Sequence, residues 1–401
     1  MPIKLLLLAL CLLFNTAFSQ TNIEEKVNNL NDIINPITTV NPEDNFDDIY
    51  FLKTSLKNAT VIGIGESTHG TAVYNTYRQR LIRFLVQEMD YKAIIDEGDI
   101  LAAEIIDAYI NNQTDSLELI GNIQPVVTNK KELDWLRAYN KNKPENERVH
   151  IYGMEVRGFY SIINRIKDYH QFTPADNVVL KKFTSNVGVG YKNLAKADFE
   201  NIKSIAEKLS ADCNDPRCKT YLPLLNQQID FAYRQRFGRG GFNVRDGYMF
   251  KNTKAIVANS YQNKAIVLAH NGHVQKTKFG KMRSLGYLLN NFYKDKYFVI
   301  ATDFGAGGVT VFDERSKDYQ SKYFDAVKDS KAVEYYFQQC KYPNFILDIA
   351  DARSNPKTKF LVAERTKMLR NMGAMGTVID WPIRLADNYD MIVFFRNTDM
   401  K

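Results

Sequence analysis

Three of the five histidines in this chain lie in two short turns that also carry glycine. His69 is in the segment GESTHG (65–70), and the other two are in the segment HNGH (270–273). A neutral imidazole accepts a proton from water near neutral pH. A nearby carboxylate such as Glu66 can fix the tautomer of the ring and stabilise its cation. These residue types at this spacing predict general acid–base chemistry that activates a water molecule.

Short apolar runs, each typical of a buried strand, precede these turns and several other polar residues. The runs cover residues 61–65, 92–96, 149–153, 264–269, 297–302 and 391–395. The polar residues that follow five of these runs are Glu66, His69, Glu97, Glu155, Arg157, His270, Asn271, His273 and Asp303. Ligands bind at the carboxyl ends of the strands in an open parallel sheet. We therefore expect these side chains to share one edge of the sheet and to form the functional site.

The order of apolar runs and helical patterns predicts the fold class. Helix-like segments near 74–89, 101–110 and 133–140 separate predicted strands that are apolar on both faces. This alternation predicts an α/β fold with a mostly parallel central sheet and helices on both faces. Residues 159–262 show a polar, helical pattern with few strand signals. We expect a single α/β domain over residues 20–401 that carries this stretch as a helical insertion or subdomain.

The residue types suggest a division of roles within the predicted site. His69 is the candidate general base, and Glu66 or Glu97 is its candidate partner carboxylate. His270 or His273 is expected to polarise a carbonyl group or to protonate a leaving alcohol. The candidate substrate-binding residues are Glu155, Arg157, Asp303 and Asn271.

Two other mechanisms would use the same segments. Ser67 lies in a segment similar to a nucleophile elbow, but the pattern G-x-S-x-G fails because His69 stands at its last position. A metal-dependent hydrolase would use Glu66, His69 and the HNGH turn as ligands, since His270 and His273 are spaced as zinc ligands on a helix. His270 is placed at a strand end, where the chain is not yet helical. We therefore expect no metal and no cofactor, with the metallohydrolase as an alternative.

The first residues are typical of an export signal. Residues 1–19 combine Lys4, an apolar run over 5–14 and the small residues Ala17 and Ser19, which is the layout of a cleaved signal peptide. The apolar run is too short to span a bilayer comfortably, and no later segment is apolar for long enough. The sequence predicts a periplasmic or secreted protein without stable membrane insertion.

Composition and charge limit the partners of the mature chain. Apolar residues make up 45% of the sequence, as in globular proteins, and the net charge of +7 is spread without a basic block. We therefore expect a small-molecule partner and no nucleic acid. Cys213 and Cys218 could close a small disulfide loop in an oxidising compartment. The sequence does not indicate the oligomeric state.

The segments that carry these residues resemble motifs of the erythromycin esterase family. The similar segments are GESTHGT (65–71), IIDEGD (94–99), IYGMEVRGF (151–159), RDGYM (245–249), LAHNGHV (268–274) and LGYLL (285–289). They follow the order of the family and cover roughly residues 50–310. The resemblance implies a hydrolase that opens an ester or macrolactone with water, as in macrolide antibiotic resistance.

The resemblance also implies roles for individual residues. The positions of the family fall on His69 as general base, on the acids Glu66 and Glu97, on Arg78 in the following helix, and on His270, with His273 as the alternative. Glu155 stands where an aspartate is common in the family. The resistance enzymes look cytoplasmic, so the export signal leaves both a macrolide-like molecule and another ester as substrates. A haem-binding protein of similar fold, with His69 or His270 as axial ligand, is a further alternative.

Overall fold

The computed structural model describes most of the chain outside the predicted signal peptide. The described residues are 22–117, 129–238, 241–313, 315–316, 318–373, 376–378 and 382–399. Residues 1–19, the predicted signal peptide, lie outside this part. Within it, no helix is long and apolar enough to cross a membrane.

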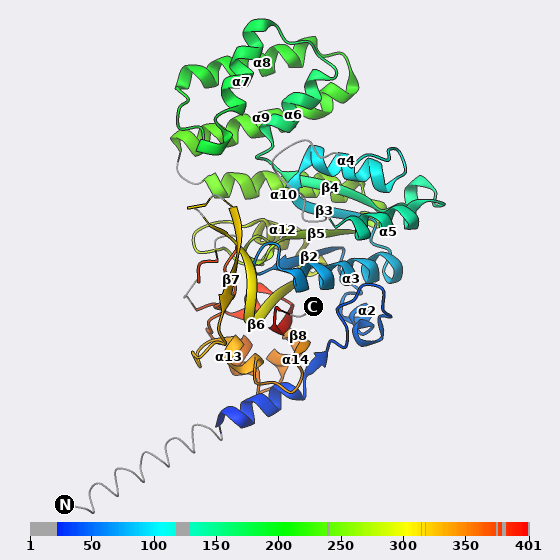
Figure 1. Ribbon diagram of the computed structural model, residues 1–401, viewed down its shortest axis with the longest axis vertical. Helices are drawn as coiled ribbons and strands as arrows, with labels where there is room; N and C mark the ends of the chain where they lie inside the picture. Colours follow the sequence, from blue (N-terminus) through cyan, green and yellow to red (C-terminus); the bar gives the residue numbers. More distant parts are fainter. Residues whose placement is uncertain are drawn as a thin grey trace, which may run out of the picture.

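A nine-stranded sheet organises the described residues (Figure 1). The strands are β1 (Ile34–Pro36), β2 (Val61–Glu66), β3 (Ala93–Asp99), β4 (His150–Glu155), β5 (Ala265–His270), β6 (Tyr297–Asp313), β7 (Asp318–Phe324), β8 (Asn344–Asp348) and β9 (Met391–Asn397). Their order is β1-β8-β9-β6-β2-β5-β3-β4, and β7 pairs with β6 outside this path. The strands from β9 to β4 are mutually parallel, whereas β1, β7 and β8 pair in antiparallel fashion. The predicted mostly parallel α/β sheet is confirmed.

The central strands are buried on both faces because alternate residues enter two different hydrophobic cores. Every residue of β2 and β5 is buried. In β2, Ile62 and Ile64 belong to one core, and Val61 belongs to the other. Strands that are apolar on both sides are stable only when helices cover both faces of the sheet.

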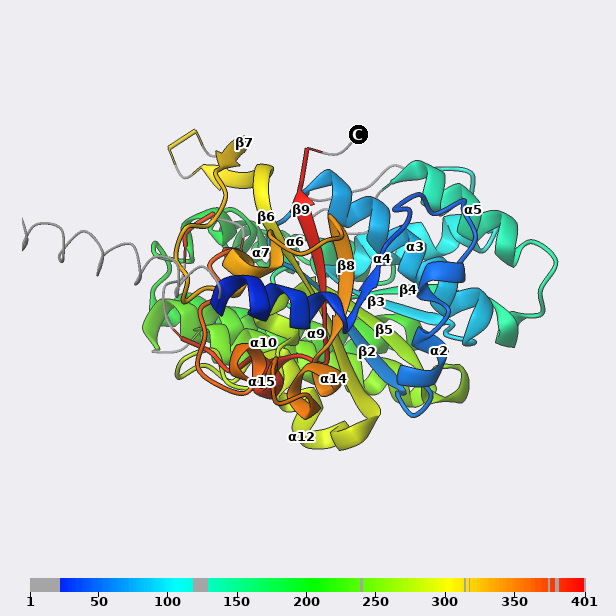
Figure 2. The same cartoon turned by 90° about the horizontal axis from the view of Figure 1, so that it is seen from below.

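Two layers of helices supply that cover (Figure 2). One face packs against α2 (Leu52–Ser55), α3 (Ala72–Glu88), α4 (Ile100–Ile110) and α5 (Lys130–Asn140). The other face packs against α10 (Gly241–Asn259), α11 (Asn271–Val274), α12 (Leu285–Tyr293), α13 (Val333–Phe337), α14 (Ile349–Ser354), α15 (Lys359–Val362), α16 (Leu385–Asn388) and a helix over 22–31. Helices on both faces agree with the prediction.

A separate helical unit stands above α10 in Figure 1. It contains α6 (Phe159–Lys167), α7 (Pro174–Thr184), α8 (Lys196–Asp212) and α9 (Pro216–Phe237), which share a hydrophobic core of their own. A disulfide between Cys213 and Cys218 joins the end of α8 to the start of α9. The expected insertion reached residue 262, but α10 differs from the other helices because Met249 and Val257 pack on the sheet. The first part of α10 also packs on the core of the helical unit through Val244 and Tyr248, so α10 joins this unit to the sheet.

Three strands and part of a fourth lie outside the predicted apolar runs. β6 continues past residue 302 to Asp313, and β7 folds back on it as a two-stranded arm (Figure 1). Almost all of β7 is exposed, so its sequence has no apolar pattern. β1 and β8 pair with each other at the far edge of the sheet. These elements depend on pairing partners that are distant in sequence.

Close backbone packing at one position connects the two predicted turns. A Cβ atom at Gly65 would lie 2.2 Å from Oδ1 of Asn271. Asn271 is fully buried, and its amide donates to the carbonyl of Thr302 over 2.8 Å. Gly65 thus lets Asn271 tie the end of β5 to β6, next to the end of β2.

We expect Gly65→Ala to destabilise the protein by about 1–3 kcal/mol, because the added methyl group must displace Asn271 from its hydrogen bonds. Gly247→Ala is the matched control: no atom lies within 4 Å of a Cβ at Gly247, which is inside α10. Alanine at this helical position should raise stability by up to about 1 kcal/mol. Denaturant unfolding of both variants measures the two changes, and equal effects would contradict this interpretation.

Candidate active site

The carboxyl ends of four adjacent parallel strands bring the predicted polar residues together. The strand order places β5 between β2 and β3, and β4 follows β3. Glu66, the last residue of β2, is directly opposite His270, the last residue of β5. Glu97 lies near the end of β3, and Glu155 ends β4. The site therefore forms at one edge of the sheet.

His69 lies in the turn between β2 and α3, where two neighbours hold it in place. Nδ1 of His69 is 2.5 Å from Oε1 of Glu66. The other carboxylate oxygen of Glu66 accepts a hydrogen bond of 2.8 Å from Nη1 of Arg78 in α3. Glu66 and Arg78 are buried, whereas the side chain of His69 is 28% exposed. This arrangement fixes the imidazole with its Nδ1–H directed at Glu66 and leaves the ring accessible.

The proton affinity of His69 follows from these contacts. Burial disfavours the imidazolium, but the hydrogen bond and the negative charge of Glu66 outweigh burial and raise the pKa of His69 above its ordinary value. Burial would likewise raise the pKa of Glu66, yet Arg78 and His69 lower it, so the carboxylate stays ionised. Nε2 of His69 has no hydrogen-bond partner among the described residues. It is therefore free to accept a proton from a bound molecule.

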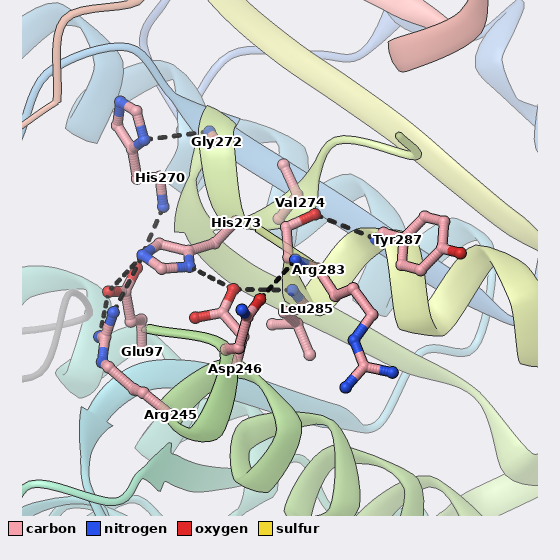
Figure 3. A network of polar contacts seen from close by, with 12 residues as sticks. Glu97, Arg245, Asp246, His270, Gly272, His273, Val274, Arg283, Leu285 and Tyr287 are labelled. Carbon is pink, nitrogen blue, oxygen red and sulfur yellow. Dashed lines mark hydrogen bonds and ion pairs between the residues drawn. The ribbon is translucent and has the colours of Figure 1, made fainter. Parts of the chain in front are cut away.

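A second network of charges adjoins the first (Figure 3). Arg245, from α10, donates through Nη2 to Glu97 Oε1 and to Glu155 Oε2, both at 2.5 Å. Nη1 of Arg245 lies 3.0 Å from Nε2 of His273, whose Nδ1 is 2.9 Å from Oδ2 of Asp246. All these side chains except that of His273 are at most 9% exposed. The network is an almost closed set of buried charges.

The acids of this network remain ionised despite their burial. Burial would raise the pKa of Glu97, but His273 and Arg245 hold it well below its ordinary value. Glu155 behaves in the same way, and Arg245 and Arg157 lower its pKa to about 2. The pKa of His273 is raised by Glu97 and Asp246 in opposition to burial. The neutral ring accepts from Arg245 and donates to Asp246, so both ring nitrogens are engaged.

The side chain of His270 links two backbone segments through hydrogen bonds. Its Nδ1 accepts from the backbone N–H of Gly272 over 3.0 Å, and its Nε2 donates to the carbonyl oxygen of Ser67 over 3.2 Å. Figure 3 shows the ring turned away from His273. Burial, together with the field of the other two imidazoles, lowers the pKa of His270 to about 4. The ring stays neutral and has no free nitrogen.

Three predicted substrate-binding residues are buried, so this expectation does not agree with their positions. Glu155 is fully buried and holds Arg245 and Arg157. Asn271 is fully buried and bonds to Thr302. Asp303 is fully buried behind the site, where burial and the nearby Glu334 raise its pKa well above the ordinary value. Asp303 lies inside β6 and not at its end. A position that follows a predicted strand therefore does not decide whether a side chain reaches the surface.

Ser67 and Arg157 differ in what they present to a bound molecule. Ser67 is fully buried, and its hydroxyl donates to the phenol oxygen of Tyr74 over 2.8 Å. The Ser67 hydroxyl therefore has a structural role in the turn, as the mismatch to the G-x-S-x-G pattern indicated. The side chain of Arg157 is 47% exposed and is paired with Glu155. Among the four predicted substrate-binding residues, Arg157 alone is accessible.

Sequence reasoning assigned no site role to Arg245 and Asp246. Both lie in α10, far in sequence from the strand ends that they contact. Their signal was the RDGYM segment, which was noted only as part of the family resemblance. The structure instead directs Arg245 at two strand-end glutamates and Asp246 at His273.

A bound metal ion requires several His, Cys, Asp or Glu side chains that converge on one point. Among the described residues, no group of three or more His, Cys, Asp or Glu side chains is arranged to hold one. The ring nitrogens of His270 and His273 are engaged in the contacts above, and a guanidinium lies between Glu97 and Glu155. These residues fit an ion-pair network better than a zinc site or a haem ligand.

Comparisons with known proteins identify relatives of the whole fold. The sequence profile of the family described as erythromycin esterase matches residues 86–398. The chain is 23% identical over 308 residues to erythromycin esterase type II of Escherichia coli, covering 65% of this chain and 73% of that protein. A structure described as a succinoglycan biosynthesis protein superimposes with a TM-score of 0.75 at 19% identity, over 93% of this chain and 97% of that chain. A mutant of the erythromycin esterase EreC in its open conformation gives a TM-score of 0.67 at 16% identity, over 90% and 97%.

We expect Glu66→Gln to lower the pKa of His69, because the substitution removes the charge that raises it while the burial that lowers it remains. Histidine-resolved NMR titration of the wild type and the variant measures the shift. Glu145→Gln is the control, since exposed Glu145 lies 3.7 Å from Nε2 of His150 in another part of the protein. An unchanged His69 titration in the Glu66 variant would contradict the assigned pair.

Proposed function

The chain belongs to the erythromycin esterase family, and on this premise we propose that it hydrolyses a carboxylic ester with a water molecule activated by His69. The observation that carries the proposal is the imidazole of His69, which combines a raised pKa, a carboxylate on Nδ1 and a free Nε2. This is the arrangement of a general base near neutral pH.

The base works through charge compensation within the turn. Nε2 of neutral His69 takes a proton from water as the oxygen attacks the ester carbonyl. The resulting imidazolium is stabilised by Glu66, which is already ionised and does not itself become protonated. Arg78 holds Glu66 in position, so little reorganisation is needed when the ring becomes charged.

The same imidazole returns the proton to the leaving alcohol. When the tetrahedral intermediate collapses, the bond to the alkoxide breaks and Nε2–H of His69 protonates it, which regenerates the neutral ring. His270 or His273 was expected to protonate the leaving alcohol, but in both residues the two ring nitrogens are engaged in hydrogen bonds. His69 therefore acts first as base and then as acid.

The substrate is a small molecule that carries an ester or lactone. The relatives named above are erythromycin esterases, which makes a macrolide-like lactone a candidate for this chain. A structural neighbour described as a succinoglycan biosynthesis protein has the same fold at low identity, and one fold can host several functions, so the fold does not restrict the substrate to macrolides.

We further propose that the protein is exported to the periplasm or secreted after cleavage of residues 1–19. The disulfide between Cys213 and Cys218 supports this proposal, because disulfides persist in oxidising compartments. Cys340 is buried, and burial raises its thiol pKa to about 12, which keeps it unreactive.

We expect His69→Gln to lower kcat/KM for a para-nitrophenyl ester by about 100-fold or more, since general base catalysis typically contributes about 10²–10⁴-fold. His170→Gln is the matched control, because that imidazole packs against Phe172 in the helical unit. Steady-state hydrolysis across pH measures both variants. In the wild type, activity should rise with pH through the raised pKa of His69, because only the neutral ring accepts a proton.

Three outcomes would contradict the proposed mechanism. Full activity of the His69 variant would show that His69 is not the general base. Activity that is lost on dialysis against a chelator and restored by zinc would instead identify a metallohydrolase. A visible absorption band after addition of haem, without ester hydrolysis, would favour the binding alternative.

Expression of the full chain in a Gram-negative host tests the proposed export. We expect a mature protein that begins near residue 20 and is released with the periplasmic fraction or the medium. Amino-terminal sequencing measures the cleavage site, and a Cys213→Ser variant expressed in parallel reports whether the exported chain carries the disulfide. A chain that keeps Met1 in the cytoplasmic fraction would refute export.

A further inference from the structure

The charged groups of the site differ in their exposure. The side chains of Glu66, Glu97, Glu155 and Asp246 are at most 9% exposed, and so are those of Arg78 and Arg245. Arg157 differs from all of them because its side chain is 47% exposed. A molecule that approaches this edge therefore meets the guanidinium of Arg157 before it meets any of the carboxylates.

Buried contacts orient this guanidinium. Oε2 of Glu155 accepts a hydrogen bond of 2.7 Å from Nε of Arg157 and lies 2.6 Å from its Nη2. Oε1 of Glu155 accepts from the backbone N–H groups of Val156 and Arg157, and Arg245 binds the same carboxylate. Glu155 is thus fixed from several sides. Arg157 is held at one edge and cannot rotate freely.

The opposite edge of the guanidinium is free. Nη1 of Arg157 has no hydrogen-bond partner within the part of the chain that the structure describes. A guanidinium presents five N–H donors in a planar fork, and its Nη1 and Nη2 groups together match the two oxygens of a carboxylate or phosphate. The free edge of Arg157 therefore has the geometry of a bidentate anion site.

This edge lies close to the catalytic groups. Arg157 shares the carboxylate of Glu155 with Arg245, and Nη2 of Arg245 also donates to Oε1 of Glu97. The other carboxylate oxygen of Glu97 accepts from the backbone N–H of His270, whose ring centroid lies 5.7 Å from that of His69. Arg157 and His69 therefore lie on the same side of the sheet edge.

We propose that Arg157 binds a carboxylate or phosphate group of the substrate, and that the enzyme favours esters with an anionic substituent near the scissile bond. The proposal rests on the proposed hydrolase function and assigns a class of substrate to it. It differs from a role in fold stability because the free edge of Arg157 contacts no described residue.

Two esters of matched length test the preference. Mono-para-nitrophenyl glutarate carries a terminal carboxylate, whereas para-nitrophenyl valerate is neutral. We expect the wild type to show a higher kcat/KM for the glutarate ester. Arg157→Gln should reduce that value by about tenfold or more, mainly through KM, because charge-assisted hydrogen bonds are among the stronger polar contacts. The value for the valerate ester should change little.

Two further variants separate recognition from structure. Arg217→Gln is the matched control, because exposed Arg217 pairs with Asp215 two residues earlier, as Arg157 pairs with Glu155. It should leave both esters unaffected. Arg157→Lys keeps the charge without the fork and should give an intermediate preference. Equal losses on both esters in Arg157→Gln, or a wild type without preference, would overturn the proposal.

Calorimetric binding of glutarate and of butyl phosphate keeps this test independent of hydrolysis. We expect the His69→Gln variant to bind at least one of these anions, and Arg157→Gln to abolish the binding, with the tighter ligand identifying the anion. Failure of ester hydrolysis with retained, Arg157-dependent binding would reject the hydrolase function alone. Absence of binding in every variant would reject the anion site.

Discussion

The compensation of buried negative charge is the constraint on which the site depends. Three carboxylates, those of Glu66, Glu97 and Glu155, lie almost fully buried at the strand ends, and an isolated buried charge is costly unless it is paired and hydrogen-bonded. Arg78 compensates Glu66, and Arg245 lies between Glu97 and Glu155. The paired Glu66 in turn raises the proton affinity of His69. The catalytic property of one ring therefore originates in ion pairs set by the strand order.

The core of the fold follows from local sequence, and its periphery does not. The central strands appear in the sequence as apolar runs because both of their faces are buried. The sequence therefore predicts β2 and β5 correctly. The β6–β7 arm lacks this signal because it leaves the core and is held by pairing along the arm. The helical pattern of α10 likewise could not show that this helix packs on the sheet as well as on the helical unit. Contacts between distant segments decide these features.

The same distinction applies to the site. His69 and Glu66 could be predicted because they are close in sequence and a tight turn limits their geometry, whereas Arg78 was assigned only through the family resemblance. Asn271 and Asp303 were placed at the correct edge, but the direction of a side chain depends on the neighbouring strand. Arg245 could not be located from spacing, since α10 reaches the site only after the helical unit. Only the hydrogen bonds of both rings could show that neither His270 nor His273 has a free ring nitrogen.

The closed network separates proton transfer from substrate recognition. Removal of one partner from a buried pair leaves a charge uncompensated, which typically costs about 3–5 kcal/mol. Arg157 is half-exposed but still pairs with the buried Glu155. Tyr319 on β7 is half-exposed as well, and substitutions at exposed positions away from buried networks usually change stability by about 0.5 kcal/mol or less. Substitutions along the exposed arm can therefore change the surface beside the site without disturbing the ion pairs that support His69. For this reason the strand-end chemistry specifies the reaction of such a chain more closely than it specifies the molecule on which the chain acts.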